Sequence, residues 1–417
     1  MRVGQIIRTV GRRLWFFLAI LGPGLITASA DNDAAGIATY SLAGSTYGYQ
    51  FLWLIVAVTF GEVVVQEMAA RMGVVTGKGT ADLIRERFGV RVTAFAMLCL
   101  LVANLGTTVA QFAGIAAAGE LFGISRYITV PLAALLVGVV VLRGTYRIVE
   151  KALLVLCAAS LSYVVSAFMV RPSWGEVLRQ AVTPSLRLDT TFILAALATI
   201  GTTMTPWGIA YMQASVADKG VSAEEYGRVR LDVVTGAIWG NFVSAFIIIC
   251  TAATLYAHGI AVSTAEQAAV ALEPLAGVWA RELFAVGLLG ASLLAASVLP
   301  LSTTYAVCEA FGWERGLNRS GREAPIFYGL YTAMIGLSVV VVLIPGIPLF
   351  PIMWLPQALN AILLPVILVL VLRLINNPKV MGTRTNSRLQ NVLGWALTIL
   401  ISIITLILFA SPLLGRL

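Results

Sequence analysis

The amino-acid sequence predicts an all-α polytopic membrane protein, on three observations. Of the 417 residues, 59% are hydrophobic and only 12% are charged, about half the charged fraction of a typical soluble protein. Apolar runs of roughly 20 residues recur along the whole chain, and each is long enough to cross a bilayer core. The runs are continuous rather than alternating, which favours helices over the strands of a membrane barrel.

Eleven transmembrane helices are expected, joined by short loops without a soluble domain. Residues 1–417 are therefore expected to form a single transmembrane domain. The predicted spans are approximately 14–44, 51–75, 93–121, 127–142, 151–170, 190–216, 232–257, 279–308, 325–344, 351–372 and 389–412.

The basic residues indicate the orientation of these spans. If the N-terminus lies in the cytoplasm, 22 of the 28 Lys and Arg residues fall on the inner side and 6 on the outer side. This asymmetry follows the positive-inside rule and predicts a multi-pass protein of the cell (plasma or inner) membrane, with the C-terminus outside. The net charge of +8 is thus explained by topology and contact with the lipid bilayer, and no nucleic acid partner is expected.

Enzymatic functions find no support in the sequence. It has no phosphate-binding glycine loop, no nucleophile with a matching base, and a single histidine. The four cysteines are isolated within predicted spans and show neither metal-ligand spacing nor a disulfide framework. No cofactor and no obligatory protein partner are expected.

Two predicted spans are interrupted near their middle. The first contains Gly22-Pro23-Gly24 and then Asp31-Asn32-Asp33, and the sixth contains the stretch 201–208 around Pro206. Proline removes a backbone donor, and the neighbouring glycines weaken the helix. Kinks in two packed helices would give the same pattern, but carboxylates inside a membrane span are rare and usually functional.

Interrupted helices five spans apart predict a 5+5 inverted repeat, with halves at about 14–170 and 190–372 and one extra helix at 389–412. In transporters built this way the unwound segments meet near the middle of the membrane, where their free carbonyls and half-helix ends bind the ion. An ion site between the first and sixth spans is therefore expected.

Several motifs resemble the Nramp family of divalent-metal transporters over nearly the full length. They are GPGLITASADNDAAGIAT (22–39), QEMAARMGVVTGK (66–78), RIVEK (147–151), PQAL (356–359) and NPKVMG (377–382). The resemblance implies a leucine-transporter-like fold of eleven or twelve helices. It also implies transport of divalent metal ions through a site between unwound helices one and six.

The chain departs from the family pattern at the metal motifs. Aligned by its flanks, the first motif keeps its aspartate as Asp33 but has Gly36 where the family has asparagine. In the sixth span Thr205 replaces the family's methionine ligand, and Trp207 replaces its histidine. Met204 lies one position early, about 100° round a helix, so a packing role is expected for it.

The resemblance also makes candidate ligands of the Ala30 and Thr202 carbonyls and of the Gln357 amide. Asp31 and Asn32 have two open interpretations. They provide a second carboxylate and an amide for water around the ion, or they cap the broken helix. The candidate metal residues are thus Ala30, Asp31, Asn32, Asp33, Gly36, Thr202, Thr205 and Gln357.

The substitutions at the metal motifs favour a hard cation over a soft one. Replacing a soft thioether by a hydroxyl, and asparagine by glycine, leaves oxygen ligands in a roomier cavity, which suits a partly hydrated Mg²⁺. Thr108 and Gln111 also stand where proton-coupled members carry acids in the third helix. These changes resemble the Nramp-related magnesium transporters and predict facilitated, proton-uncoupled uptake of Mg²⁺, and of Mn²⁺, by alternating access.

Other functions stay open at this point. A proton-coupled Mn²⁺/Fe²⁺ importer, as in the parent family, is the main alternative, and a channel or an organic-solute permease of the same fold are more distant ones. In the second span, Glu67 and Arg71 at spacing i,i+4 predict an interfacial ion pair rather than a pathway for ions.

Overall fold

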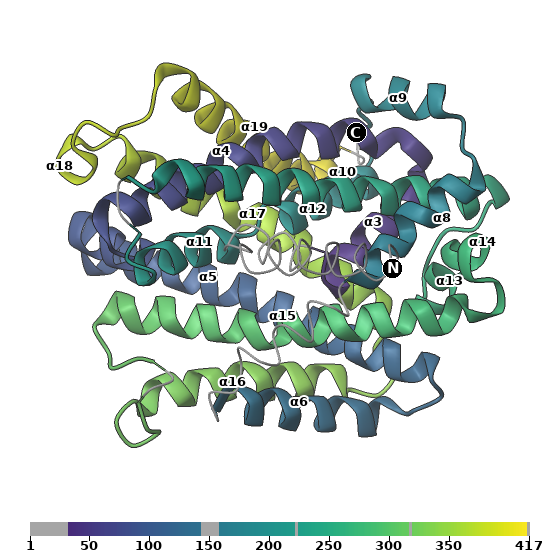
Figure 1. Ribbon diagram of the computed structural model, residues 1–417, viewed down its shortest axis with the longest axis horizontal. Coiled ribbons are helices and arrows are strands. Elements are labelled where there is room, and N and C mark those ends of the chain that lie inside the picture. Colours follow the sequence, from purple (N-terminus) through teal and green to yellow (C-terminus); the bar gives the residue numbers. More distant parts are fainter. Residues whose placement is uncertain (1–31, 143–157, 222–223, 317–318, 415–417) are drawn as a thin grey trace, which may run out of the picture.

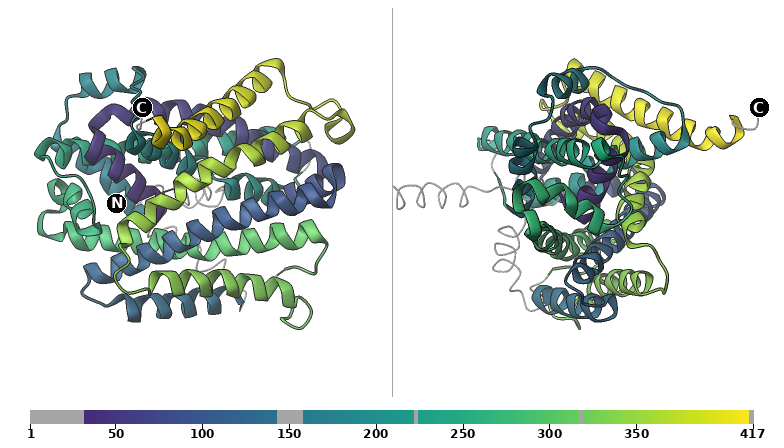
Figure 2. Two further views of the ribbon diagram at one scale, coloured as in Figure 1. Left: turned by 180° about the vertical axis from the view of Figure 1, so that it is seen from behind. Right: turned by 90° about the vertical axis from the view of Figure 1, so that its right-hand side faces the viewer.

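The computed structural model describes residues 32–142, 158–221, 224–316 and 319–414, and all regular elements in these ranges are helical. The long helices lie side by side along the long axis of the molecule (Figure 1). They are α4 (Leu52–Thr76), α5 (Thr80–Leu121), α6 (Arg126–Leu142), α12 (Tyr226–Thr254), α15 (Ala280–Phe311), α16 (Pro325–Val342) and α17 (Leu349–Ile375). Helix α19 (Arg388–Leu414) runs obliquely to them and projects from the side of the bundle (Figure 2).

Eight helical segments among the described residues are long and apolar enough to cross a membrane. Together with the all-helical architecture, this confirms the predicted polytopic class. The count of eleven spans stays a prediction, because residues 14–31 and 151–157 of the first and fifth predicted spans lie outside the described residues.

The predicted interruption of the sixth span is confirmed. Helix α10 (Thr190–Thr203) ends at Met204, and α11 (Pro206–Asp218) begins two residues later. Pro206 has no N–H to continue the first helix, and Thr205 adopts an extended conformation with φ −83° and ψ 138°. In the first span, α3 (Ala34–Tyr47) begins directly after Asp33, so the described helix starts inside the predicted span.

Helices at equivalent positions of the two predicted halves pack against each other. Helix α4 contacts α12, α5 contacts α15, and α6 contacts α16. The pair of α6 and α16 forms one edge of the molecule, and α17 runs between α5 and α19 (Figure 2). A two-fold relation between the halves would produce this pairing, and the repeat boundaries themselves stay a prediction.

The described links at one end of the bundle, which we name the basic end, are 77–79, 219–221, 224–225, 312–316, 319–324 and 376–387. This end carries α18 (Pro378–Met381) and lies on the left in Figure 1. The opposite end holds α9 (Trp174–Val182), α13 (Ala265–Ala269) and α14 (Glu273–Ala276), all short helices within loops. Helix α8 (Ser162–Val170) leads into α9.

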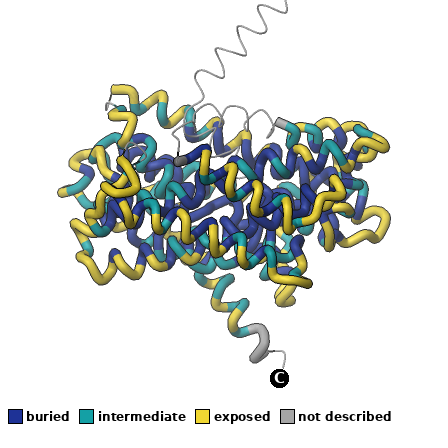
Figure 3. The backbone as a smooth tube through the Cα atoms, turned by 90° about the horizontal axis from the view of Figure 1, so that it is seen from below, coloured by how far each residue is buried: buried dark blue, intermediate teal, exposed yellow. Residues whose placement is uncertain are grey.

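The core lies along the bundle axis, and the outer faces are apolar and exposed (Figure 3). On the outer helices, Leu132 of α6, Val340 of α16 and Leu406 of α19 are each more than 60% exposed. Large apolar side chains on the outside of a helical bundle are typical of a surface that contacts lipid tails. The burial pattern therefore agrees with a membrane-spanning bundle.

The closest helix packing in the core depends on Gly201 in α10. A Cβ at this position would lie 1.9 Å from the Gln357 carbonyl oxygen and 2.7 Å from the Ala361 amide nitrogen of α17. We expect Gly201→Ala to destabilise the protein by about 3 kcal/mol, because two backbones would have to separate. Thermal unfolding in detergent measures the loss. Gly336→Ala is the control, since a Cβ there meets nothing within 4 Å, and equal melting temperatures for the two variants would contradict this packing.

Candidate metal site

Asp33 lies at the start of α3 and caps its first turn. Its Oδ1 accepts a hydrogen bond of 2.8 Å from the Gly36 backbone N–H, and the side chain is buried in the bundle. Aspartate is favoured here because its carboxylate satisfies a backbone donor that has no partner inside the helix. Donors at a helix N-terminus also stabilise negative charge. The local sequence thus places a carboxylate at the predicted depth of the ion site.

Gln111 of α5 holds both Asp33 and the first residue of α3. Its Nε2 donates to Asp33 Oδ2 at 2.6 Å, while its Oε1 accepts from the Ala34 backbone N–H at 3.2 Å. A glutamine presents one donor and one acceptor, so it fits a carboxylate and an N–H that lie side by side. In the sequence Gln111 stands out only as a neutral residue in place of an acid, which does not predict this contact, although glutamine keeps the length and hydrogen-bonding capacity of glutamate.

Thr205 plays the equivalent part at the break in the sixth span. It is buried, and its Oγ1 accepts from the Gly208 backbone N–H at 3.2 Å, so it caps α11 as Asp33 caps α3. Between α10 and α3, the hydroxyls of Thr203 and Tyr40 lie 2.9 Å apart. This contact brings the end of α10 against the helix that Asp33 begins, and the neighbouring Thr202 is buried.

The Met204 side chain is buried and packs toward α4. A Cβ built at Gly61 of α4 would lie 3.3 Å from the Met204 sulfur, which places the thioether between α10 and α4. This position agrees with the predicted packing role and leaves oxygen atoms as the candidate ligands near the breaks.

Gln357 of α17 joins the same region through buried amides. Its Oε1 accepts from Asn360 Nδ2 at 2.7 Å, and Asn360 Nδ2 also contacts Thr107 Oγ1 of α5 at 2.9 Å. Thr107 lies one helical turn from Gln111, so α5 connects Asp33 with Gln357. The Gln357 Nε2 and Asn360 Oδ1 atoms are buried without a hydrogen-bond partner among the described residues. Such atoms mark a place for water or an ion.

The remaining predicted ligands are distributed differently. Asn32 bonds to α12: its Nδ2 donates to the Gly240 carbonyl and its Oδ1 accepts from Ser244 Oγ, both at 3.1 Å. Gly36 has no side chain, and its backbone N–H donates to Asp33. Ala30 and Asp31 lie outside the described residues. Asp33 itself caps α3, and both interpretations of Asp31 and Asn32 stay predictions.

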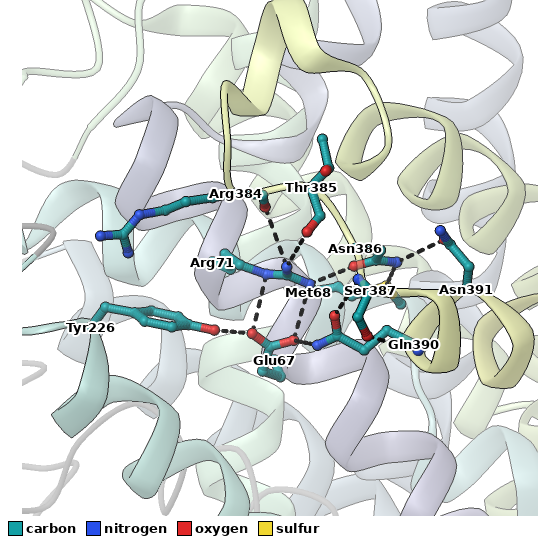
Figure 4. Close-up of polar contacts among 10 residues, drawn as sticks. All are labelled: Glu67, Met68, Arg71, Tyr226, Arg384, Thr385, Asn386, Ser387, Gln390 and Asn391. Carbon is teal, nitrogen blue, oxygen red and sulfur yellow. Dashed lines mark hydrogen bonds and ion pairs between the residues drawn. The ribbon is translucent and has the colours of Figure 1, made fainter.

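The predicted ion pair between Glu67 and Arg71 is confirmed, with a distance of 3.1 Å between Arg71 Nε and Glu67 Oε1. Both side chains are buried within the protein, with exposures of 6% and 7%. Figure 4 shows that it belongs to a network near the basic end, which we name the Arg71 cluster. Its members are Glu67, Met68, Arg71, Tyr226, Arg384, Thr385, Asn386, Ser387, Gln390 and Asn391.

The Arg71 cluster ties three parts of the chain together. Arg71 of α4 donates to the carbonyls of Arg384 and Thr385 at 3.2 and 3.1 Å, in the link before α19. Glu67 accepts from Tyr226 Oη at the start of α12 and, at 3.0 Å, from Gln390 Nε2 of α19. The sequence predicted the pair from its spacing but not these partners, which come from segments far along the chain.

Arg71→Met leaves the Glu67 carboxylate buried without its cation, and we expect a loss of about 3 kcal/mol in the free energy of unfolding. Unfolding followed by tryptophan fluorescence measures it. The double variant Glu67→Gln/Arg71→Met should recover part of the loss, because no unpaired charge remains. The exposed pair Glu176–Arg179 on α9 is the control, and Arg179→Met should leave the melting temperature almost unchanged. A larger effect at Arg179 than at Arg71 would contradict the argument.

The described residues contain no group of three or more His, Cys, Asp or Glu side chains able to hold a metal ion. The candidate site instead has one described carboxylate, Asp33, with hydroxyl, amide and backbone oxygens as its other candidate ligands. Such oxygen-rich sites bind hard cations that keep part of their hydration shell. A break in the sixth span and a buried carboxylate at the start of α3, inside an all-helical membrane bundle, are typical of secondary transporters.

Comparison with known proteins gives the family. The Nramp family model, described as natural resistance-associated macrophage protein-like, matches residues 24–411. The divalent metal cation transporter MntH of Erwinia tasmaniensis is 29% identical over 92% of both chains. MntH of Klebsiella pneumoniae is 27% identical over 95% of both. The chain belongs to the Nramp family.

Solved structures support the fold. The Eremococcus coleocola manganese transporter, bound to an aromatic bis-isothiourea compound, superposes with a TM-score of 0.75 at 23% identity, covering 94% of this chain and 86% of that one. MhsT in complex with L-phenylalanine superposes with a TM-score of 0.60 at 17% identity, covering 93% and 98%. The expected leucine-transporter-like fold is thereby confirmed, and the protein is a membrane transporter rather than an enzyme.

Proposed function

We propose that this protein mediates facilitated, proton-uncoupled uptake of Mg²⁺ by alternating access, with Mn²⁺ as a second substrate. The ion binds partly hydrated between the breaks that begin α3 and α11. The basic end faces the cytoplasm, as the N-terminus does, and the C-terminus lies outside. The membrane potential drives the divalent cation inward, because the sequence has no nucleotide-binding motif.

The nature of the ligands supports a hard ion. Asp33 is the carboxylate at the break, and Thr205 offers a hydroxyl where a thioether would favour a softer metal. Met204 packs its sulfur toward α4 instead. Mg²⁺ is usually held by one or two carboxylates with several waters retained. Asp33 with neutral oxygen donors around it supplies this kind of site.

The contact between Gln111 and Asp33 carries the proposal of uncoupled transport. The partner of the Asp33 carboxylate at 2.6 Å is an amide that has no titratable proton. Thr108, the other position with a neutral side chain in place of an acid, donates to the Asn104 carbonyl of its own helix. The only histidine, His258, is exposed at the end of the bundle away from the basic end. This arrangement lacks the usual side chains for passing a proton alongside the metal.

The second candidate is proton-coupled import of Mn²⁺ or Fe²⁺, favoured by the manganese transporter and MntH names of the relatives. Proteoliposomes with a negative interior potential separate the two, if they contain a Mg²⁺ reporter and a pH dye. We expect saturable Mg²⁺ entry without acidification. Absence of Mg²⁺ entry, or acidification in proportion to metal entry, would favour the second candidate. Flux too fast to saturate would indicate a channel.

Thr205→Met tests the basis of ion selectivity. A thioether at this position should raise the ratio of Mn²⁺ to Mg²⁺ uptake by roughly tenfold, the effect of a ~1.4 kcal/mol change in relative binding. It also removes the cap of α11, at a cost of about 1 kcal/mol in stability. Thr264→Met is the control because Thr264 caps α13, away from the breaks. An unchanged uptake ratio in the Thr205 variant would remove Thr205 from the ligand set.

A further inference from the structure

A polar pocket of about 340 Å³ lies at the basic end, separate from the candidate metal site. Three membrane helices end around it. Thr76, the last residue of α4, lines it, α5 begins at Thr80, and α18 follows the end of α17 at Ile375. A cavity just beyond the ends of three membrane spans lies at the depth of the lipid headgroups.

The charges that line this pocket are mainly positive. Lys78, Arg87 and Lys379 contribute three cations, and Glu86 contributes the one carboxylate. Lys78 Nζ lies 2.5 Å from Glu86 Oε1, whereas Arg87 and Lys379 form no ion pair within the described parts of the chain. The pocket therefore presents an excess of two positive charges to one side of the membrane, and this excess favours an anionic ligand.

The lining is also amphipathic. Two apolar side chains also line the pocket. They are Leu83, buried in the first turns of α5, and Val380 of α18. A free inorganic anion would gain nothing from apolar wall. A glycerophospholipid has both parts, a phosphate for the cations and a glycerol–acyl region for the wall.

We propose that this pocket binds the phosphate headgroup of an anionic glycerophospholipid in the cytoplasmic leaflet. Arg87 and Lys379 hold the phosphate, and Lys78 joins them when it leaves Glu86. The lipid links the start of α5 to α18 and thereby to the end of α17. This site is independent of the metal site and of the ion that is carried.

Binding of dioctanoyl-phosphatidylglycerol to the purified full-length protein in detergent tests the proposal, followed by native mass spectrometry. We expect one saturable site, and no comparable binding of dioctanoyl-phosphatidylcholine. Arg87→Gln/Lys379→Gln should weaken binding about 25-fold, because each cation near an anionic group contributes about a factor of five. Glu86→Gln should strengthen it by up to about fivefold, because Lys78 loses its competing partner.

Matched variants at the basic end distinguish specific lipid binding in the pocket from nonspecific attraction by the positive charge of this end. Lys219→Gln/Arg322→Gln removes two exposed cations outside the pocket, and Glu323→Gln removes an exposed carboxylate. Both should bind the lipid as the wild type does. All substituted side chains are exposed, and gel filtration with metal flux verifies that the variants are folded.

Three results would overturn the proposal. The control pair could lower lipid affinity as much as the pocket pair, which would indicate diffuse attraction. The pocket pair could leave affinity unchanged. Inorganic phosphate could bind as tightly as the lipid analogue and displace it, which would make the pocket a site for a soluble anion.

Discussion

Asp33→Asn should reduce Mg²⁺ uptake at least about 100-fold while leaving the protein folded. The substitution removes the carboxylate at the break, and loss of a ligand should exceed the 10- to 100-fold effects seen when only its supporting contacts are lost. Asparagine is as good a helix cap as aspartate, so the bond from the Gly36 N–H can be kept. Uptake into proteoliposomes and the melting temperature, measured together, separate loss of charge from loss of the cap.

Asp189→Asn is the control for this variant. Asp189 caps α10 by accepting from the Phe192 backbone N–H at 2.8 Å, and it is exposed at the end of the bundle away from the basic end. The same exchange there should leave uptake near the wild-type rate. Asp33→Ala removes both the charge and the cap, so it should lose uptake and about 1 kcal/mol of stability. Mg²⁺ uptake by Asp33→Asn at the wild-type rate would remove Asp33 from the site.

Much of the architecture could be predicted from the sequence because its signals are local. The length of the apolar runs predicted the membrane-spanning class, and Pro206 with its neighbours predicted the break before α11. The spacing of Glu67 and Arg71 predicted their ion pair, because i,i+4 side chains meet on one face of a helix. Each of these features depends on residues that are close together in the chain.

What the sequence could not predict depends on contacts between distant segments. Gln111 and Asp33 are 78 residues apart, and a missing acid gave no sign that its replacement would hold the carboxylate. Tyr226 reaches Glu67 across 159 residues. The bend of α5 at Gly89, where φ is 76°, was also missed: the charged stretch around Gly89 lies between two predicted spans, and a single glycine does not reveal whether its positive φ is used.

Gln111→Glu should make metal transport depend on pH. The new carboxyl would lie where Gln111 Nε2 now donates to Asp33 Oδ2 at 2.6 Å. Two carboxylates this close share one proton, because their like charges oppose joint ionisation. A divalent ion that binds between them displaces this proton. The apparent affinity for Mg²⁺ should therefore rise with pH by up to about tenfold per unit, the limit for one proton released per ion.

Calorimetry in buffers of different ionisation enthalpy counts the released protons, and uptake from about pH 5.5 to about pH 8 gives the matching transport profile.

The double variant Asp33→Asn/Gln111→Glu is the control. Its new carboxylate on α5 would accept hydrogen bonds from both the introduced asparagine amide and the Ala34 N–H, which restores the packing but leaves a single carboxylate. This variant should recover stability, release fewer protons than Gln111→Glu, and fail to restore uptake. A flat pH profile for Gln111→Glu would show that position 111 does not govern proton coupling. A steep profile would show that one amide beside Asp33 keeps protons out of the transport step.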